Sequence, residues 1–332
     1  MTRLIRLFLS LILVHAAIIS CVPKDVVNPV TPPPAPAEPE PEEPDTPSGE
    51  SSMTVCTFNI RYANTDDTYP DGSSAAWSVR APAVKQFIDA AKPDLIGLQE
   101  VRREQSNFFS SSYFNSEYGY YDVCRDSSSG SSVASAGGEG VGVMYLKSRF
   151  ELVQKDFFWL DDSTRQMPAK NSDGTYGAWN SACRRVTVYV VLKDKKNNDA
   201  LVYFFPTHYD HKSAEARKKS AELMVSQIKA LTKETDLKNT SKLIIHLGDL
   251  NTTSDSSELK PLNDSMEYAR LTGSGKDKNS ATFNGFGKSS SIIDHIYYGC
   301  QSIKPGKYWV EGSNYGLPYL SDHNPVLFQF EY

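Results

Sequence analysis

Runs of apolar residues recur along the chain, and their spacing predicts alternating strands and helices. Short runs rich in Val, Ile, Tyr and Phe indicate buried strands, whereas two longer segments repeat apolar residues at helical spacing. The predicted strands are residues 55–60, 94–98, 141–145, 185–192, 201–207, 243–247, 292–298 and 326–330. The predicted helices are residues 78–91 and 214–235, the second with Ser213 as its N-cap. This order predicts an α/β fold in which helices cover mixed β-sheets.

The first 50 residues differ in composition from the rest. Residues 1–20 place Arg3 and Arg6 before a mostly apolar run that is shorter than the roughly 20 residues of a membrane span, which is typical of a signal peptide. Cys21 follows and resembles the lipid-bearing cysteine of a bacterial lipoprotein, although Ile18 stands where Leu is usual. The alternative is a cleaved secretory peptide with an incidental cysteine.

Residues 21–50 are rich in Pro and Glu, a composition that predicts an extended tether, because such a segment buries too little apolar surface to fold. We therefore expect a lipid anchor at Cys21, a tether to residue 50, and a catalytic domain over residues 51–332. This organisation predicts a membrane-anchored lipoprotein outside the cytoplasm, in the periplasm or on the cell surface. The sequence implies no protein partner.

The body of the chain is nearly neutral. The net charge of −5 includes +2 from residues 1–20 and −6 from residues 21–50, so residues 51–332 carry −5 − 2 + 6 = −1. Such a body lacks the basic footprint of most nucleic-acid-binding proteins, although a local groove or a metal ion can supply a positive field. Its four cysteines show no metal or disulfide spacing, which predicts free thiols, and the Ser- and Gly-rich residues 122–138 predict a mobile loop.

Polar side chains stand at the ends of the predicted strands, where layered α/β folds collect their functional sites. Taken singly, each has a structural explanation: a turn residue, an acid at a helix start, or a satisfied core histidine. As a set they supply one complete mechanism for hydrolysing a phosphoester. The set comprises Asn59, Glu100, His208, Asp249, Asn251, Asp294, Asp322 and His323.

Hard cations such as Mg²⁺ or Mn²⁺ bind oxygen ligands, and Glu100 with the amide oxygen of Asn59 fits that preference. The closely spaced His or Cys ligands of a zinc site are absent from the sequence. His323, held by Asp294, is predicted to be the general base that activates a water.

Asp249 and Asn251 are predicted to orient the water and the phosphate. His208 is expected to donate a hydrogen bond or a proton to the developing charge.

These residues lie in motifs that resemble the endonuclease/exonuclease/phosphatase superfamily, which includes pancreatic-type deoxyribonuclease, sphingomyelinases and inositol polyphosphate 5-phosphatases. The resemblance covers residues 53–332. The matching motifs are Thr57-Phe58-Asn59, Gln99-Glu100, Thr207-His208-Tyr209-Asp210-His211, Gly248-Asp249-Leu250-Asn251, Ile293-Asp294-His295-Ile296 and Ser321-Asp322-His323. Pro206 and Leu250 depart from the commoner residues without removing a functional group.

The resemblance implies a four-layer α/β sandwich with two central mixed sheets flanked by helices and the site at one open end. It also implies that Glu100 is the principal metal ligand with Asn59 beside it, and that Asp322 lies near the metal. His323 would pair with Asp294, and His208 would contact the scissile phosphate. Arg184 or Arg185 could reach a phosphate or could be a surface charge.

The resulting expectation is an exported, divalent-metal-dependent phosphoesterase that acts on a phosphodiester or phosphomonoester of an organic phosphate. A nuclease with the same mechanism is the second hypothesis. A lipid phosphodiesterase would need exposed apolar loops, for which residues 315–320 are the candidate. A glycan- or phosphate-binding lipoprotein without activity is the competing class, which the completeness of the site disfavours.

Overall fold

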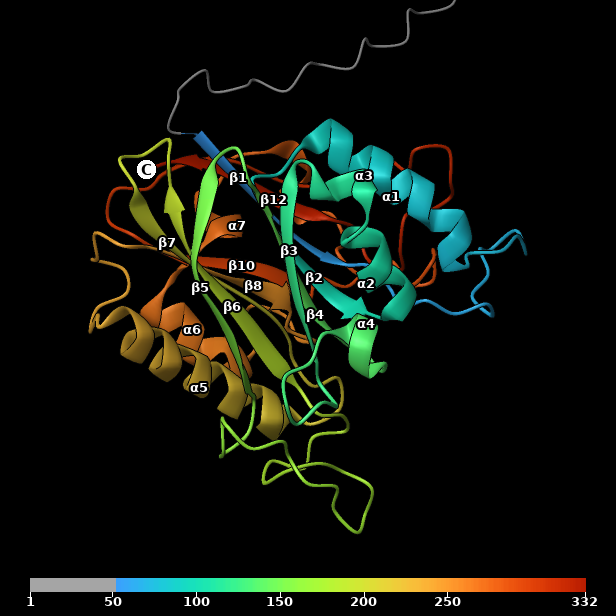
Figure 1. Cartoon of the computed structure of the whole chain (residues 1–332), viewed down its shortest axis with the longest axis horizontal. Coiled ribbons are helices and arrows are strands. Elements are labelled where there is room, and N and C mark those ends of the chain that lie inside the picture. The colour runs from blue at the N-terminus through green and yellow to red at the C-terminus, as the bar shows by residue number, and fades with distance from the viewer. Residues whose placement is uncertain (1–51) are drawn as a thin grey trace, which may run out of the picture. The chain divides into compact units, whose positions relative to one another are not determined.

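The alternating apolar pattern of residues 52–332, the part of the chain described by this computed structural model, builds two six-stranded mixed sheets that lie face to face (Figure 1). In spatial order, the first sheet contains β11 (Lys304–Val310), β12 (Val326–Glu331), β1 (Ser52–Asn59), β2 (Leu95–Val101), β4 (Gly140–Leu146) and β3 (Tyr118–Cys124). The second contains β5 (Phe150–Trp159), β6 (Val186–Asp194), β7 (Ala200–His208), β8 (Leu243–Asp249), β10 (Asp294–Gly299) and β9 (Glu267–Tyr268).

Helices cover the outer faces of both sheets, which makes four layers. The first sheet packs against α1 (Trp77–Ala91), with α2 (Arg103–Phe109), α3 (Ser112–Asn115) and α4 (Val133–Ala136) beside it. The second sheet packs against α5 (Ala214–Thr232) and α6 (Lys260–Ser265), and α7 (Ala269–Thr272) lies between β9 and β11 in sequence and contacts both. Two short 3₁₀ turns occupy Ser257–Leu259 and Lys276–Asn279. The predicted α/β sandwich is confirmed.

The period-two alternation of each strand divides its side chains between two cores. On β1, Val55 points into the core between the sheets, whereas Phe58 packs under α1. On β6, Val188 and Val190 fill the core between the sheets, whereas Tyr189 faces α5. Strands that are buried on both faces therefore read in the sequence as continuous apolar runs.

Gly97 allows the two sheets to approach closely near the ends of β2 and β7. A Cβ atom at this position would lie 2.3 Å from Leu247 Cδ1 and 2.7 Å from Pro206 Cβ. Both neighbours belong to the second sheet, so a larger residue at position 97 would push the sheets apart. This contact brings the strand ends of the two sheets together.

Arg80 connects α1 to the chain segments on either side of the strand ends. The buried guanidinium donates to the carbonyl oxygens of Ala75 (2.7 Å), Ile60 (2.7 Å), Arg61 (3.0 Å) and Leu320 (3.1 Å). Burial lowers the pKa of Arg80 to about 10, and the carboxylate of Asp322 opposes that change. The residue therefore fixes the backbone that follows Asn59 and the backbone that precedes Asp322.

Strands β3, β5, β9 and β11 are not predicted from the sequence, and three predicted segments differ from the structure. Residues 122–138 are not one loop, because residues 122–124 end β3 and α4 occupies Val133–Ala136, where Asp122 Oδ1 accepts a hydrogen bond from the Val133 backbone N–H. The helix predicted to reach residue 235 ends at Thr232, because Lys233 adopts a left-handed φ of 59°. The strand predicted from residue 292 begins at Asp294.

Other predictions are confirmed. Ser213 caps α5 by accepting a hydrogen bond from the Ala216 backbone N–H, and the four cysteines of the described residues are free thiols. The predicted signal peptide, Cys21 and the tether lie outside the described residues. Among residues 52–332, none of the helices has the length and apolar character that crossing a membrane requires.

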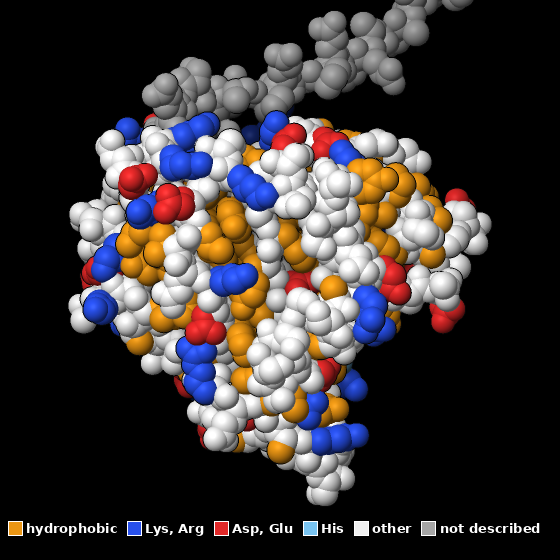
Figure 2. Space-filling view, viewed as in Figure 1, with side chains coloured by type: hydrophobic (Ala, Val, Ile, Leu, Met, Phe, Trp, Pro, Cys, Tyr) orange, Lys and Arg blue, Asp and Glu red, His pale blue; other side chains and the backbone are white. Residues whose placement is uncertain are grey.

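Charged side chains of both signs lie on the face of the domain shown in Figure 2. On the face shown in Figure 2, Lys and Arg side chains are scattered and alternate with Asp and Glu. This distribution agrees with the nearly neutral charge of residues 51–332.

Candidate active site

Strand pairing places the predicted site residues next to one another. β7 and β8 are parallel with His208 opposite Asp249, and the antiparallel β10 places Asp294 opposite Asp249 on the other side. In the first sheet, β1 and β2 are parallel with Asn59 opposite Gln99, so Glu100 follows directly. β12 runs antiparallel to β1, so the segment that precedes it, with Asp322 and His323, also returns to this end of the sandwich.

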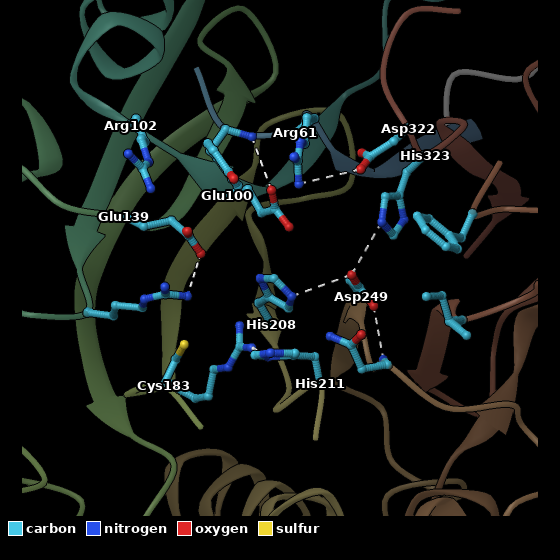
Figure 3. A pocket seen from close by; sticks show the side chains of 16 residues that line it. Arg61, Glu100, Arg102, Glu139, Cys183, His208, His211, Asp249, Asp322 and His323 are labelled. Atoms are coloured by element: carbon cyan, nitrogen blue, oxygen red, sulfur yellow. Dashed lines mark hydrogen bonds and ion pairs between the residues drawn. The ribbon is translucent and has the colours of Figure 1, made fainter. Parts of the chain in front are cut away.

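A cavity of about 480 Å³ opens where these strands end. Six of the eight predicted residues line the cavity. The other two bond to lining residues: Asn59 to Glu100 and Asp249, and Asp294 to His323. The lining residues are Arg61, Tyr62, Glu100, Arg102, Arg125, Glu139, Cys183, Arg185, His208, His211, Asp249, Asn251, Phe283, Ile293, Asp322 and His323 (Figure 3). Its volume lies in the range of small-molecule sites.

Glu100 sits at an irregular point of β2. The pairing of β2 with β4 shifts register between Leu98 and Val101, and Glu100 has a φ of 62°, in the left-handed region that non-glycine residues seldom occupy. The Tyr62 backbone N–H donates to Glu100 Oε2 at 3.1 Å. The bulge therefore turns the carboxylate of Glu100 into the cavity at a cost in backbone strain, which is a feature of functional sites.

Asn59 connects two carboxylates. Its Nδ2 donates to Glu100 Oε1 at 3.2 Å and to Asp249 Oδ2 at 3.0 Å, and its Oδ1 accepts from the Arg61 backbone N–H at 3.0 Å. The amide nitrogen, rather than the oxygen, therefore faces the carboxylates. This geometry favours a positioning role for Asn59 over the role of an oxygen ligand that the sequence suggested.

His323 lies between two carboxylates. Its Nδ1 donates to Asp294 Oδ2 at 2.8 Å, and its Nε2 lies 3.6 Å from Asp249 Oδ2. The ring of Phe283 packs against the imidazole at a centroid distance of 4.8 Å. The predicted pairing of His323 with Asp294 is therefore present, and it directs Nε2 toward Asp249 and the cavity.

Charges and burial change the pKa of both groups. Burial acts to lower the pKa of His323, but Asp294 and Asp249 outweigh it and raise this pKa to about 10. Burial raises the pKa of Asp249 to about 7, while His323 acts to lower it. The two carboxylates therefore favour the imidazolium form of His323, and burial favours the protonated form of Asp249.

His208 and Asn251 complete the second-sheet side of the site. His208 Nε2 lies 3.4 Å from Asp249 Oδ2, and burial together with the charges of Arg185 and Arg125 lowers the pKa of His208 well below its usual value. The Asn251 backbone N–H donates to Asp249 Oδ1 at 2.9 Å, with Asn251 itself at a φ of 53°. His208 is therefore a neutral hydrogen-bonding group beside Asp249.

Asp322 faces the same cavity as Glu100. Its Oδ2 lies 3.7 Å from Arg61 Nη1, and its Oδ1 accepts from the Ser321 hydroxyl at 3.3 Å. Burial raises the pKa of Asp322, and the charge of Glu100 raises it further. Two carboxylates that repel each other across a cavity form an oxygen-rich setting for a cation.

Sequence reasoning did not identify most of the basic side chains in the cavity. Arg61 and Arg102 hold the ring of Tyr62 between them, with guanidinium carbons 4.1 and 4.3 Å from its centroid. Of the neighbouring Arg184 and Arg185, only Arg185 lines the cavity, whereas Arg184 binds the Pro168 carbonyl and Asp126. The arginine residue type suggests phosphate binding, but the loop conformation decides whether each guanidinium group points into the cavity.

Residues 56–323 match the model of the Endonuclease/Exonuclease/phosphatase family. The chain belongs to this family. Members of the endonuclease/exonuclease/phosphatase family are phosphoester hydrolases that generally depend on divalent metals, and the chain is accordingly a hydrolase of phosphoester bonds. No curated protein matches the chain in sequence.

Solved structures of the family resemble the whole domain. An endonuclease/exonuclease/phosphatase from Bacteroides vulgatus is 28% identical with a TM-score of 0.69, and the match covers 84% of this chain and 98% of that one. A mannosyl-6-phosphatase from Bacteroides thetaiotaomicron is 24% identical with a TM-score of 0.70, covering 84% and 100%. The human Nocturnin catalytic domain with bound sulfate is 18% identical with a TM-score of 0.61, covering 85% and 94%. The last two show a likeness of fold.

Proposed function

We propose that this protein is an exported, divalent-metal-dependent phosphoesterase that hydrolyses a small organic phosphate. The observation that carries the proposal is the convergence of two chemical units on one cavity. One unit is the pair of carboxylates of Glu100 and Asp322, and the other is the imidazole of His323 held by Asp294. Together they match what phosphoester hydrolysis requires: charge neutralisation at phosphorus and a positioned proton carrier.

The donor set fits Mg²⁺ or Mn²⁺. Glu100 would be the direct ligand with Asp322 close by, and Asn59 would hold the Glu100 carboxylate through its amide nitrogen. The bound cation would neutralise negative charge on the phosphoryl oxygens. Oxygen-rich ligands of this kind favour hard cations over zinc.

Ligand-type atoms of Asp249, Asp294 and His323 also lie within 4.8 Å of one another. In this group, His323 Nδ1 already donates to Asp294 at 2.8 Å, and Asp294 and Asp249 raise the pKa of the imidazole to about 10. A cation at this position would have to compete with a proton for the ring. We therefore assign this group to proton handling.

Within that group, Asp249 is suited to take a proton from the attacking water, since burial raises its pKa to about 7. His323, as an imidazolium, would donate a hydrogen bond to a phosphoryl oxygen, and neutral His208 would donate a second one. Asn251 would orient the phosphate from the same strand end. The sequence suggested instead that His323 is the base, and the pH dependence of the reaction separates the two assignments.

Three observations support a small organic phosphate over a polymer or a lipid as substrate. The cavity of about 480 Å³ suits a small molecule. Residues 51–332 carry a net charge of only −1, so the domain lacks the overall positive charge that is typical of a nuclease. Residues 315–320 pack inward, with Leu320 buried and Tyr315 and Leu317 against the core under α1, so this loop offers little apolar surface to a membrane. Nucleic acid remains the alternative substrate, in which case the protein would be an extracytoplasmic nuclease.

The location is part of the proposal. Residues 1–20 would direct export, and a lipid on Cys21 would anchor the domain outside the cytoplasm through the tether of residues 21–50. A surface anchor of this kind places the active site where it meets extracellular organic phosphates.

Hydrolysis of bis-p-nitrophenyl phosphate tests the activity. We expect activity with Mg²⁺ or Mn²⁺, its loss in EDTA, and its return when Mg²⁺ is restored. Glu100→Gln keeps the size of the side chain and removes its charge, so this variant should lose at least about 100-fold in kcat. Glu104→Gln, an exposed acid on α2, is the matched control and should keep the wild-type rate. EDTA-resistant hydrolysis would contradict the metal dependence, and wild-type activity in Glu100→Gln would contradict the assigned ligand.

A further inference from the structure

The cavity has two chemically different sides. In Figure 3, His323 lies on one side, Arg102 and Glu139 lie on the other, and Glu100 and His208 lie between them. The proposed chemistry uses the first side and the middle, because the scissile phosphate must contact Glu100, His208 and His323 together. The second side therefore faces the rest of the substrate.

Arg185 is the most deeply buried basic residue on this second side. Its side chain is 4% exposed, and Nη2 contacts His211 Nδ1 at 2.8 Å. Nε and Nη1 have no hydrogen-bond partner within the described residues, and the nearby Asp210 Oδ2 lies 3.5 Å from Nε. A buried donor without an acceptor costs about 1–3 kcal/mol. Both nitrogens are buried from solvent, so a ligand group that accepts from them and removes this cost requires the Arg185 side chain to turn toward the cavity that it lines.

Arg125 and Arg102 bring two further guanidinium groups to this side of the cavity. Arg125 Nη1 forms a short hydrogen bond to Glu139 Oε1, and Nε of Arg102 is buried without a partner within residues 52–332. Burial raises the pKa of Glu139, while the charges of Arg125, Arg185 and Arg102 all oppose that change, so each of the three guanidinium groups acts on this carboxylate. Carboxylates also lie beside these three cations: Glu139, Asp210 at 3.5 Å from Arg185 Nε, and Asp126 at 3.9 Å from Arg125 Nε. The second side is therefore distinguished by guanidinium N–H groups that lack acceptors within the described residues, rather than by an excess of positive charge.

We propose that this second side, formed by Arg102, Arg125, Glu139 and Arg185, is an anion-binding subsite for a second charged group of the substrate. The preferred substrates are then phosphate esters that carry a further phosphate or carboxylate group. A neutral hydroxyl accepts one weak hydrogen bond, whereas a phosphate or carboxylate oxygen accepts stronger, charge-assisted hydrogen bonds from several guanidinium N–H groups. The inference rests on the proposed function, because it assumes that the scissile phosphate occupies the His323 side.

Three hydrolysis-resistant ligands test the subsite. Propylphosphonate has one anionic group, propane-1,3-bisphosphonate has two, and 4-phosphonobutanoate replaces the second phosphonate by a carboxylate on the same three-carbon chain. Calorimetric titration of the protein in Mg²⁺ should show at least about tenfold tighter binding of one or both two-anion ligands than of propylphosphonate. The ligand with the larger gain identifies the anion that the subsite prefers.

Substitutions then test whether Arg185 causes the preference for two-anion ligands over the one-anion ligand. Arg185→Gln should reduce the ratio between two-anion and one-anion affinities to about twofold or less, and Arg185→Lys should restore part of it. Arg184→Gln is the matched control, because Arg184 is the adjacent arginine and its guanidinium binds Pro168 and Asp126 outside the cavity lining. Circular dichroism checks folding, and Arg102→Gln provides a second test if Arg185→Gln does not fold.

Equal affinity of the wild-type protein for the one-anion and two-anion ligands would overturn the inference. Equal weakening of all ligands by Arg185→Gln would also overturn it and would place Arg185 at the scissile phosphate instead. Hydrolysis of bis-p-nitrophenyl phosphate reports on the proposed function separately. Retained hydrolysis without a two-anion preference therefore refutes only the subsite.

Discussion

The bond between Asp294 and His323 gives the sharpest test of proton handling. In Asp294→Asn, a neutral amide replaces a carboxylate that is 1% exposed and that accepts from His323 Nδ1 at 2.8 Å. A hydrogen bond to a charged group contributes roughly 1.5–3 kcal/mol. If this energy stabilises the imidazolium in the transition state, its loss reduces kcat by roughly 10- to 150-fold.

The same energy sets the pKa of His323. Since 1.36 kcal/mol corresponds to one pKa unit, the pKa of His323 should fall by about one to two units in Asp294→Asn. The imidazolium then deprotonates at lower pH, so the alkaline limb of the pH–rate profile should shift to lower pH by the same one to two units. KM should change little, because the residue does not line the cavity.

The assay is initial-rate hydrolysis of bis-p-nitrophenyl phosphate in Mg²⁺ across pH. Asp122→Asn is the matched control, because Asp122 is a buried aspartate that bonds Tyr120 and Val133 away from the active-site cavity. This variant should keep the wild-type kcat. A kcat of Asp294→Asn within twofold of wild type, with an unmoved alkaline limb, would refute the assigned role of the pair.

Two further predictions concern pH and location. Activity should rise with pH as Asp249 deprotonates, because its pKa is raised to about 7. It should fall at higher pH as His323 deprotonates, because its pKa is raised to about 10. A bound cation shifts both the rising and the falling limb of the pH–rate profile to lower pH. A kcat/KM profile that rises with pH and then stays flat would support His323 as the base instead. Cys21→Ser should move the protein from the membrane fraction to the soluble fraction, as measured by fractionation and immunoblotting, with Cys56→Ser as the control, whereas unchanged partitioning would argue against the lipid anchor.

The strand ends could be predicted from the sequence because each apolar run stops at a polar motif. Parallel pairing then aligns the ends, as with His208 beside Asp249, so the convergence of the site follows from the fold. β5 is not predicted, because its first eight residues include four exposed or half-exposed polar residues in place of an apolar run.

Other features depend on contacts between distant residues. The sequence does not distinguish Arg102, which lines the cavity, from Arg103 beside it, which begins α2 and is exposed. The direction of the Asn59 amide is set by Glu100, Asp249 and the Arg61 backbone, residues that only the folded chain brings together. Such details require coordinates because a motif fixes a residue type and not its hydrogen-bond partners.

The most direct measurement is a crystal structure of the full domain grown with Mn²⁺ and the propylphosphonate ligand, with Mn²⁺ located by its anomalous signal. We predict the cation at the Glu100 carboxylate on the Asp322 side of the cavity, and a phosphonate oxygen within hydrogen-bonding distance of both His208 and His323. A cation held instead by Asp249, Asp294 and His323, or a phosphonate bound outside this cavity, would contradict the arrangement on which the proposed function depends.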